Sequence, residues 1–323
     1  MLRVEHLRRS WPDGWTLADV SFEVAPGDLA AIVGPSGSGK TTVLRLVAGL
    51  ETPEAGRVLV DGRDVTREAP EARHLAYVFQ EGALFPHLDV RRNVAFGLRV
   101  RGLDASRADE ALALVGLEGF SARRVQALSG GERSRVALAR ALAPVLAGAA
   151  PRVLLLDEPF SALDRPLRED LRRAVSSLHR RLGLTTVLVT HDREEALTLA
   201  DRIVVLRGGR VVEHGPAEQL YSRPSRAFTA RFLGSANVLS PDEARALGGP
   251  RVAEDLTLAV PISAVRAGPG EGAVVAEAGW ASGRAVVESR GVRLVAEDAR
   301  RDLRAGAVVR LEIDWSEGRA LEE

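Results

Sequence analysis

The only lysine in the chain ends a glycine-rich segment, and this combination could bind phosphate groups. The other basic positions hold arginine or histidine, so Lys40 stands where the chemistry needs a compact ammonium rather than a planar guanidinium. Glycines let backbone amides turn inward around phosphates, and a following helix N-terminus adds partial positive charge. The predicted loop consists of Gly34, Pro35, Ser36, Gly37, Ser38, Gly39, Lys40, Thr41 and Thr42.

The segments that flank this loop are those of a P-loop, a phosphate-binding turn between a strand and a helix. Residues 29–33 are continuously apolar and predict a buried strand, and residues 43–48 predict a helix that ends at Gly49. In that context Lys40 would reach the β- and γ-phosphates of a nucleotide, and the Thr41 hydroxyl would ligate Mg²⁺. The alternative is a glycine-rich turn without a ligand.

Two adjacent acids end a second apolar run and could serve phosphoryl transfer. Residues 153–156 predict another buried strand, which Asp157 and Glu158 follow directly. The carboxyl end of a central parallel strand is where ligands bind in sheets of this type. Asp157 is therefore the predicted second anchor for Mg²⁺, and Glu158 is the candidate to polarise the attacking water. The alternative is that both acids only mark a strand end.

A serine and two glycines precede a predicted helix at residues 133–142, and they allow two interpretations. Ser129 is a favourable helix N-cap, with the glycines forming a turn. Alternatively, the backbone amides of Ser129, Gly130 and Gly131 could donate to a phosphate at the helix start. The segment 128–142, LSGGERSRVALARAL, resembles the signature of ABC-type ATPases, which simple P-loop kinases and GTPases lack.

Further motifs similar to those of this family follow in the expected order. The glutamine loop corresponds to residues 77–80 and its exit to residues 84–88. The D-loop corresponds to residues 161–164, and the histidine switch to residues 189–192. The resemblance implies that Gln80 contacts Mg²⁺ or the attacking water, that His191 holds the γ-phosphate, and that Asp164 links two sites. It also implies an aromatic residue stacked on adenine. Trp11 is the first candidate and Trp15 the second, although either could be plain packing.

The resemblance implies a homodimer as the working unit. Two ATP molecules with Mg²⁺ would lie between Lys40 of one copy and Ser129–Gly131 of the other. ATP binding would close the dimer and hydrolysis would open it. The resemblance covers about residues 1–235, with two departures. Glu132 stands where many relatives have glutamine, and the segment 143–151, before the second strand, is a few residues longer than the family pattern.

The predicted fold class is α/β, and residues 1–234 would form the ATP-binding domain. This P-loop NTPase core would include an antiparallel β portion built from residues 2–4 and 20–24. A helical subdomain would span about residues 83–148, where apolar side chains recur at helical spacing. The positions that carry this spacing are Ala108, Leu112, Val115, Val136 and Ala139.

In residues 235–323 the sequence pattern changes to short runs of alternating apolar and polar residues, which predict strands. These runs are residues 256–260, 284–287, 292–295 and 308–313, separated by glycines at Gly268-Pro269-Gly270, Gly283 and Gly306. The pattern predicts a small β-barrel of OB type that resembles the TOBE domain of importer ATPases. OB barrels can bind oligonucleotides, but this segment has no series of stacking aromatics, so no nucleic-acid partner is expected.

The composition directs the search for partners. Lys+Arg and Asp+Glu both number 44, which gives no reason to expect nucleic-acid or acidic-lipid binding, and the absence of cysteine excludes disulfides. No apolar run approaches the roughly 18 residues of a membrane span, and the charged N-terminus lacks a signal-peptide pattern. A role in transport would therefore need integral membrane permease subunits, and indirectly a periplasmic or lipid-anchored solute-binding protein. The expected location is peripheral, at the cytoplasmic face of the inner membrane.

The permease would dock near Gln80, residues 84–86 and the helical subdomain, unless residues 84–86 are only a hydrophobic turn. Two alternatives to an importer subunit remain open. A soluble ABC ATPase of translation or DNA repair would usually carry two nucleotide domains or a long insertion, and an exporter subunit would often lack the C-terminal barrel. The cargo group suggested by resemblance is ferric iron, polyamines, sulfate, molybdate or sugars, with a preference for iron or polyamines.

Overall fold

A computed structural model of the protein describes residues 1–80, 83–148, 153–161, 163–279, 284–298, 305 and 307–322. The chain divides into two compact units, Met1–Ala217 and Glu218–Glu323. This division falls before the boundary expected after Gly234. The physical reason is that α8 (Ala227–Leu233) buries Ala227 and Ala230 against residues of the second unit, among them Ala259 and Leu321.

The central sheet of the first unit has the strand order β10-β9-β3-β8-β7-β6. Its strands are parallel, except that β10 runs antiparallel to β9. The strands predicted at residues 29–33 and 153–156 are confirmed, and both are buried along their whole length, as expected for a sheet covered on both faces. The bounds are β3 Leu29–Val33, β6 Leu75–Val78, β7 Val153–Asp157, β8 Thr185–Val189, β9 Arg202–Arg207 and β10 Arg210–Pro216.

A second, antiparallel sheet has the order β2-β1-β4-β5. Leu2 pairs with Val24 and Val4 with Phe22, which confirms the predicted antiparallel portion. The strands are β1 Leu2–Ser10, β2 Thr16–Val24, β4 Ala55–Val60 and β5 Arg63–Asp64. Helix α1 (Lys40–Ala48) shares one hydrophobic core with this sheet and with one set of side chains of the central sheet. The predicted end of this helix at Gly49 is confirmed.

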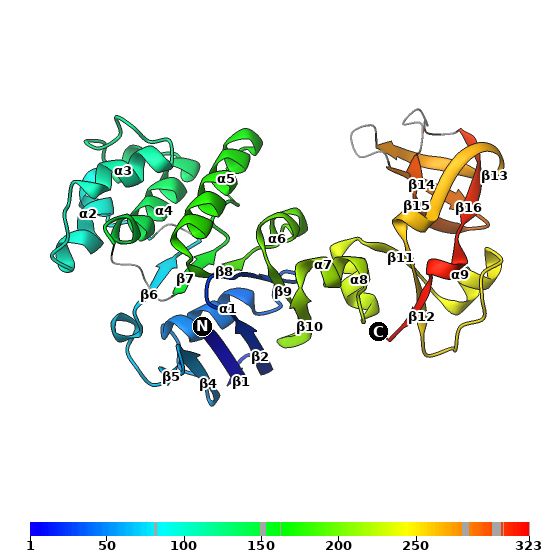
Figure 1. Ribbon diagram of the computed structural model, residues 1–323, viewed down its shortest axis with the longest axis horizontal. Helices are drawn as coiled ribbons and strands as arrows, with labels where there is room; N and C mark the ends of the chain where they lie inside the picture. The colour runs from blue at the N-terminus through cyan, green and yellow to red at the C-terminus, as the bar shows by residue number, and fades with distance from the viewer. Residues whose placement is uncertain are drawn as a thin grey trace. The chain divides into compact units, whose positions relative to one another are not determined.

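Three helices form the predicted helical part: α2 (Val90–Val100), α3 (Arg107–Leu114) and α4 (Gly130–Leu146). They lie together in Figure 1, and the five positions predicted to face the core are all buried. Helix α4 is longer than the predicted 133–142, since it starts directly after Ser129 and continues through Pro144. A Cβ on Gly97 of α2 would lie 3.4 Å from the Pro144 ring, so α2 and α4 approach closely there.

Helix α5 (Arg165–Leu182) and helix α6 (Arg193–Leu199) complete the first unit. Helix α5 is amphipathic: it buries Leu171, Val175 and Leu178 and exposes most of its arginines. Each of these helices follows a segment with a predicted catalytic role. Among the described residues, no helix is long and apolar enough to cross a lipid bilayer.

In its described residues the second unit contains two small sheets, of order β11-β12-β17 and β14-β15-β13-β16. Because β14 also pairs with β13, the larger sheet curves back on itself as in the predicted OB-type barrel. Its helices are α7 (Ala217–Ser222, which begins at the unit boundary), α8 and α9 (Pro241–Ala246). Its strands are β11 Ala236–Leu239, β12 Thr257–Pro261, β13 Val265–Gly279, β14 Arg284–Ser289, β15 Val292–Asp298, β16 Val308–Ile313 and β17 Arg319–Leu321.

The prediction that Gly268-Pro269-Gly270 separates two strands is wrong. The segment lies inside β13, whose pairing with β16 shifts register between Pro269 and Ala273. A β-bulge of this kind accommodates the glycines and the missing proline amide without ending the strand. The other predicted separators, Gly283 and Gly306, lie outside the described residues.

Candidate active site

The glycine-rich loop connects β3 to α1, and two of its glycines are required by close contacts. A Cβ on Gly34 would lie 2.1 Å from the Leu206 carbonyl oxygen of β9. Gly39 has φ +101° and would place a Cβ 2.7 Å from the Trp15 ring. No side chain fits at either position without moving its neighbours, so the loop can follow this path only with glycine there.

Lys40 begins α1 and turns its side chain back over the loop. Its Nζ donates hydrogen bonds to the carbonyl oxygens of Gly34, at 2.9 Å, and Pro35, at 3.1 Å. Burial lowers the pKa of Lys40, and the nearby carboxylates of Glu158 and Asp157 oppose that shift. The ammonium is thus held within the loop, facing two acids.

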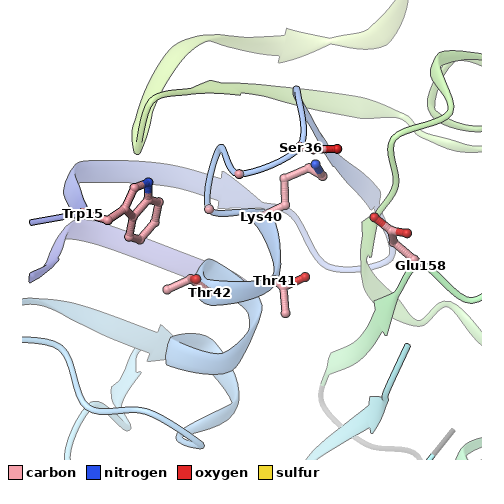
Figure 2. Close-up of a pocket in the computed structure, with 8 residues that line it drawn as sticks. Trp15, Ser36, Lys40, Thr41, Thr42 and Glu158 are labelled. Atoms are coloured by element: carbon pink, nitrogen blue, oxygen red, sulfur yellow. The ribbon is translucent and has the colours of Figure 1, made fainter. Parts of the chain in front are cut away.

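A cavity of about 420 Å³ opens above the loop. In Figure 2 the side chains of Ser36, Lys40 and Thr41 lie on the loop and at the start of α1, and the Glu158 carboxylate points toward them from the end of β7. The lining residues are Trp15, Ser36, Gly37, Gly39, Lys40, Thr41, Thr42 and Glu158. The structure therefore brings most of the predicted phosphate loop to one cavity.

The aromatic residue at this cavity is Trp15, whereas Trp11 is the first candidate from the sequence. The chain turns between the two tryptophans, with the Gly14 amide donating to the Trp11 carbonyl oxygen and the Trp11 amide to that of Trp15. Trp15 lies against Gly39, and the Trp11 ring packs on Trp15 with ring centroids 5.0 Å apart. Of the two candidates, Trp15 is the one that lines the cavity.

Asp157 accepts two hydrogen bonds that fix the plane of its carboxylate. Thr41 Oγ1 donates to Oδ1 at 2.9 Å, and Tyr77 Oη donates to Oδ2 at 2.8 Å. Asp157 is 2% exposed, and burial raises the pKa of its carboxylate, against the opposing effect of the two hydroxyl donors. A hydroxyl and a carboxylate oxygen side by side suit Mg²⁺, which takes oxygen ligands and few of them from protein.

Three predicted catalytic side chains meet at the ends of neighbouring strands. Gln80 Nε2 donates to Glu158 Oε2 at 3.2 Å, and His191 Nδ1 lies 3.2 Å from the same oxygen. Because β6, β7 and β8 are parallel neighbours, their carboxyl ends deliver these side chains to one edge of the sheet. Glu158 has a positive φ of 45°, an uncommon conformation for a residue with a side chain.

Ser129, Gly130 and Gly131 lie at the start of α4, and none of them is among the residues that line the Lys40 cavity. Ser129 caps the helix: its Oγ accepts from the Glu132 amide, and the Glu132 carboxylate accepts from the Ser129 amide at 2.7 Å. The cap interpretation is confirmed, and the glutamate that departs from the family pattern completes it. The amides of Gly130 and Gly131 are not used by this cap.

A sequence model described as "ABC transporter" matches residues 17–161. The sulfate/thiosulfate import ATP-binding protein CysA of Xylella fastidiosa (strain Temecula1) is 49% identical over 246 residues, which cover 74% of this chain and 69% of that protein. The spermidine/putrescine import ATP-binding protein PotA of Methylococcus capsulatus is 51% identical over 227 residues, 69% of this chain and 58% of that protein. This chain belongs to the ABC transporter family.

Solved structures agree with this assignment. The dimeric post-hydrolysis state of the ATP-binding cassette MJ0796, bound to ADP and Pi, aligns with a TM-score of 0.62 and 31% identity. That alignment covers 67% of this chain and 99% of the cassette. The family predicted from the signature segment is confirmed, and the chain is an ATP-binding and ATP-hydrolysing protein of the ABC family.

Sequence reasoning missed the role of Tyr77 in this ABC ATPase. The residue was noted only as part of the glutamine-loop motif, yet its hydroxyl bonds to Asp157. The sequence contained one signal for this contact: Tyr77 lies in a short strand, and the strand beside it ends in Asp157. Tyr77 pairs with Leu155 of β7, two residues before Asp157, which brings the ring alongside the carboxylate.

Proposed function

We propose that this chain is the ATP-hydrolysing subunit of an ABC importer, which binds MgATP in the cavity above the phosphate loop. The observation that carries the proposal is the meeting of three groups at one edge of one sheet. These are the Lys40 ammonium, the Thr41–Asp157 pair, and Glu158 with its two partners. Import is favoured because the relatives described above are import ATP-binding proteins.

Lys40 and the loop amides would hold the β- and γ-phosphates, exchanging the two loop carbonyls that Lys40 now contacts for phosphate oxygens. Thr41 Oγ1 and Asp157 would hold Mg²⁺, which neutralises phosphate charge when it is bound, and Gln80 would contact it or the attacking water. Trp15, which lines the cavity and contacts the Trp11 ring, would stack on the adenine.

Glu158 would accept the proton of the attacking water. Its contacts with Gln80 and His191 both fall on Oε2, so Oε1 is available to the water. His191, which lies beside Oε2 of the same carboxylate, would contact the γ-phosphate. Positioning and charge neutralisation account for most of phosphoryl transfer, which fits a site with one base and several orienting groups.

A second copy of the chain would complete each site. The two glycine amides left unused by the Ser129 cap could donate to the γ-phosphate bound by the partner, and Asp164 at the start of α5 would link the two sites. The compared cassette was solved as a dimer with ADP and Pi. ATP binding would close the two copies, and hydrolysis would let them open.

Integral membrane permease subunits would dock on the aromatic surface of the helical part. Phe85 packs against Phe96 with ring centroids 4.5 Å apart, and Phe96 and Val100 of α2 are exposed. Asn93 holds the Phe85 backbone from both sides, at 2.8 and 3.1 Å. This surface follows Gln80 along the chain, so a change at the γ-phosphate would be transmitted to the permease.

We further propose a peripheral position at the cytoplasmic face of the inner membrane, with a periplasmic or lipid-anchored protein delivering the solute. The relatives import sulfate, thiosulfate or polyamines according to their names, and we propose cargo of this group. The OB-type barrel would stabilise the dimer or regulate it. The soluble alternative predicts no effect of a permease on the ATPase rate.

The Glu158→Gln variant tests the proposal. It should bind MgATP, accumulate as a dimer in size-exclusion chromatography, and show ATP turnover lowered by about a thousandfold or more. The control is the wild-type chain with ATP in EDTA, where Mg²⁺ is removed and the chain should stay monomeric. Turnover of the variant close to that of the wild type would remove Glu158 as the base.

A further inference from the structure

The two residues that flank His191 are held through one arginine from another helix. Arg172 of α5 donates from Nη2 to Asp192 Oδ2 at 2.9 Å and to Glu195 Oε1 at 2.5 Å. The other oxygen of Glu195 accepts from Thr190 Oγ1 at 2.6 Å. The residue before His191 and the residue after it are therefore both linked to the same guanidinium.

The remaining bonds of this network are local. The Asp192 amide donates to Thr190 Oγ1 at 3.0 Å, and Asp192 Oδ1 caps α6 by accepting from the Glu194 amide at 2.8 Å. These bonds close the turn on itself. Arg172 is the member of the network that ties the turn to α5, and it does so where the side chains of Arg172 and Glu195 are 15% and 5% exposed. A buried ion pair of this kind holds its geometry because losing one partner leaves an unpaired charge.

The His191 ring has little support of its own. Its side chain is 60% exposed, and its contact with a charged group is the 3.2 Å approach of Nδ1 to Glu158 Oε2. Packing does not fix an exposed ring, so the direction of His191 follows the backbone of the turn between Thr190 and Asp192. That backbone is held at the Thr190 amide by the Ile32 carbonyl oxygen of β3, at 3.3 Å, and on the side-chain side by the network on Arg172.

We propose that Arg172 is a positioning residue that sets the direction of His191 and couples it to α5. This inference rests on the proposed function, in which His191 contacts the γ-phosphate. Arg172 lies eight residues after Asp164, about 12 Å along a continuous helix. If the segment around Asp164, which would link the two copies, shifts, α5 and therefore Arg172 would shift with it. Arg172 would in turn move the turn that carries His191.

Kinetic coupling between two variants tests the proposal. Arg172→Met should lower kcat about tenfold while changing KM for ATP less than about twofold. In a His191→Ala background, the same change should alter the residual kcat less than about twofold, because neighbours that act together are not additive. Arg173→Met is the matched control: the next residue on the helix is exposed, pairs with Asp170, and should be neutral in both backgrounds.

A readout without turnover separates this proposal from the proposed function. The chain has six histidines, so the ring C–H signals in NMR can be assigned with His191→Ala. Arg172→Met should shift the His191 signal and reduce its response to added ATP, while Arg173→Met leaves both unchanged. If Arg172→Met does not fold, Glu195→Gln, which keeps the side-chain shape, should give the same pattern. An unchanged His191 signal, or an equal loss of kcat in both backgrounds, would mean that Arg172 only stabilises the fold. Absence of ATP hydrolysis in the wild type would instead remove the proposed function.

Discussion

The Tyr77 hydroxyl donates to Asp157 Oδ2 at 2.8 Å, on the side of the carboxylate opposite to Thr41. Each oxygen of the predicted magnesium acid therefore has its own donor. The tyrosine belongs to β6, three residues before Gln80, so the strand that leads to the glutamine is hydrogen-bonded to the acid of the next strand. Burial and the Asp157 carboxylate raise the pKa of Tyr77 well above its usual value, which keeps the phenol a donor.

Tyr77→Phe should weaken the contribution of metal to nucleotide binding. Groups that orient metal ligands typically change metal affinity by 10-fold or more, so we expect the ratio of ATP affinity with Mg²⁺ to that in EDTA to fall by about tenfold. Equilibrium binding of a fluorescent ATP analogue under both conditions measures this ratio. The matched control is Tyr221→Phe, which changes the only other tyrosine of the chain. A drop in EDTA as large as that with Mg²⁺ would show a general loss of structure instead.

Lys40→Arg should be as damaging as Lys40→Ala, although it keeps the positive charge. Nζ fits between the carbonyl oxygens of Gly34 and Pro35, and a planar guanidinium is too wide for that position. We expect nucleotide affinity to fall by about a hundredfold in both variants. Isothermal titration with MgATP measures it, and retention of affinity within twofold in Lys40→Arg would contradict the requirement for an ammonium.

The strand–loop–helix unit around Lys40 and the strand ending in Asp157 could be predicted from the sequence because their patterns are local. Continuous apolar runs, a glycine loop and a helix-ending glycine each depend on a few adjacent residues. The resemblance of residues 128–142 to the family signature then predicted that these elements belong to one ATP site. The extra length of α4 could not be predicted, because burial of the Pro144 ring against Gly97 overrides the tendency of proline to end a helix.

Contacts across the sheet were less accessible from sequence. The choice between Trp11 and Trp15 depends on a turn that brings one ring against Gly39, and the role of Tyr77 depends on the pairing of two strands distant in sequence. In the second unit, the sequence predicts a separator at Gly268–Gly270 because glycine and proline disfavour strands. The register shift in β13 resolves that conflict, and it arises from pairing with β16.

Trp15→Ala should weaken ATP binding without affecting a ligand that has only phosphates. Stacking of a base on an aromatic side chain contributes about 1–3 kcal/mol, so we expect affinity for ATP to fall roughly 5- to 150-fold. Tripolyphosphate, which has no base, should bind as in the wild type. Trp11→Ala should have a smaller effect, since Trp15 lines the cavity and Trp11 packs on it. If tripolyphosphate binding falls equally, Trp15 serves the loop through Gly39 rather than the base.

Arg73→Met should loosen the end of the helix that begins with Lys40. Arg73 is buried, and Nη1 donates to the carbonyl oxygens of Leu46 and Val47 in the last turn of α1. Nη2 and Nε donate to the carbonyls of Thr66 and Glu68, so one guanidinium joins α1 to the segment after β5. Methionine has similar bulk but no donors, so all four of these hydrogen bonds would be lost, and within the described part of the chain only the Leu46 carbonyl would keep a backbone donor, the Gly49 amide.

We expect Arg73→Met to destabilise the first unit by about 2–4 kcal/mol, from several lost hydrogen bonds at about 0.5–1.5 kcal/mol each. Hydrogen exchange of the amides in residues 43–48 is the appropriate measurement, since it reports on α1 without mixing in the second unit. Arg67→Met, at an exposed arginine of the same segment, is the control. Exchange should accelerate in Arg73→Met alone. Because Lys40 is the first residue of α1, ATP affinity should fall as well, and added MgATP should restore part of the protection. Equal exchange in the two variants would mean that Gly49 and its neighbours hold the helix end without Arg73.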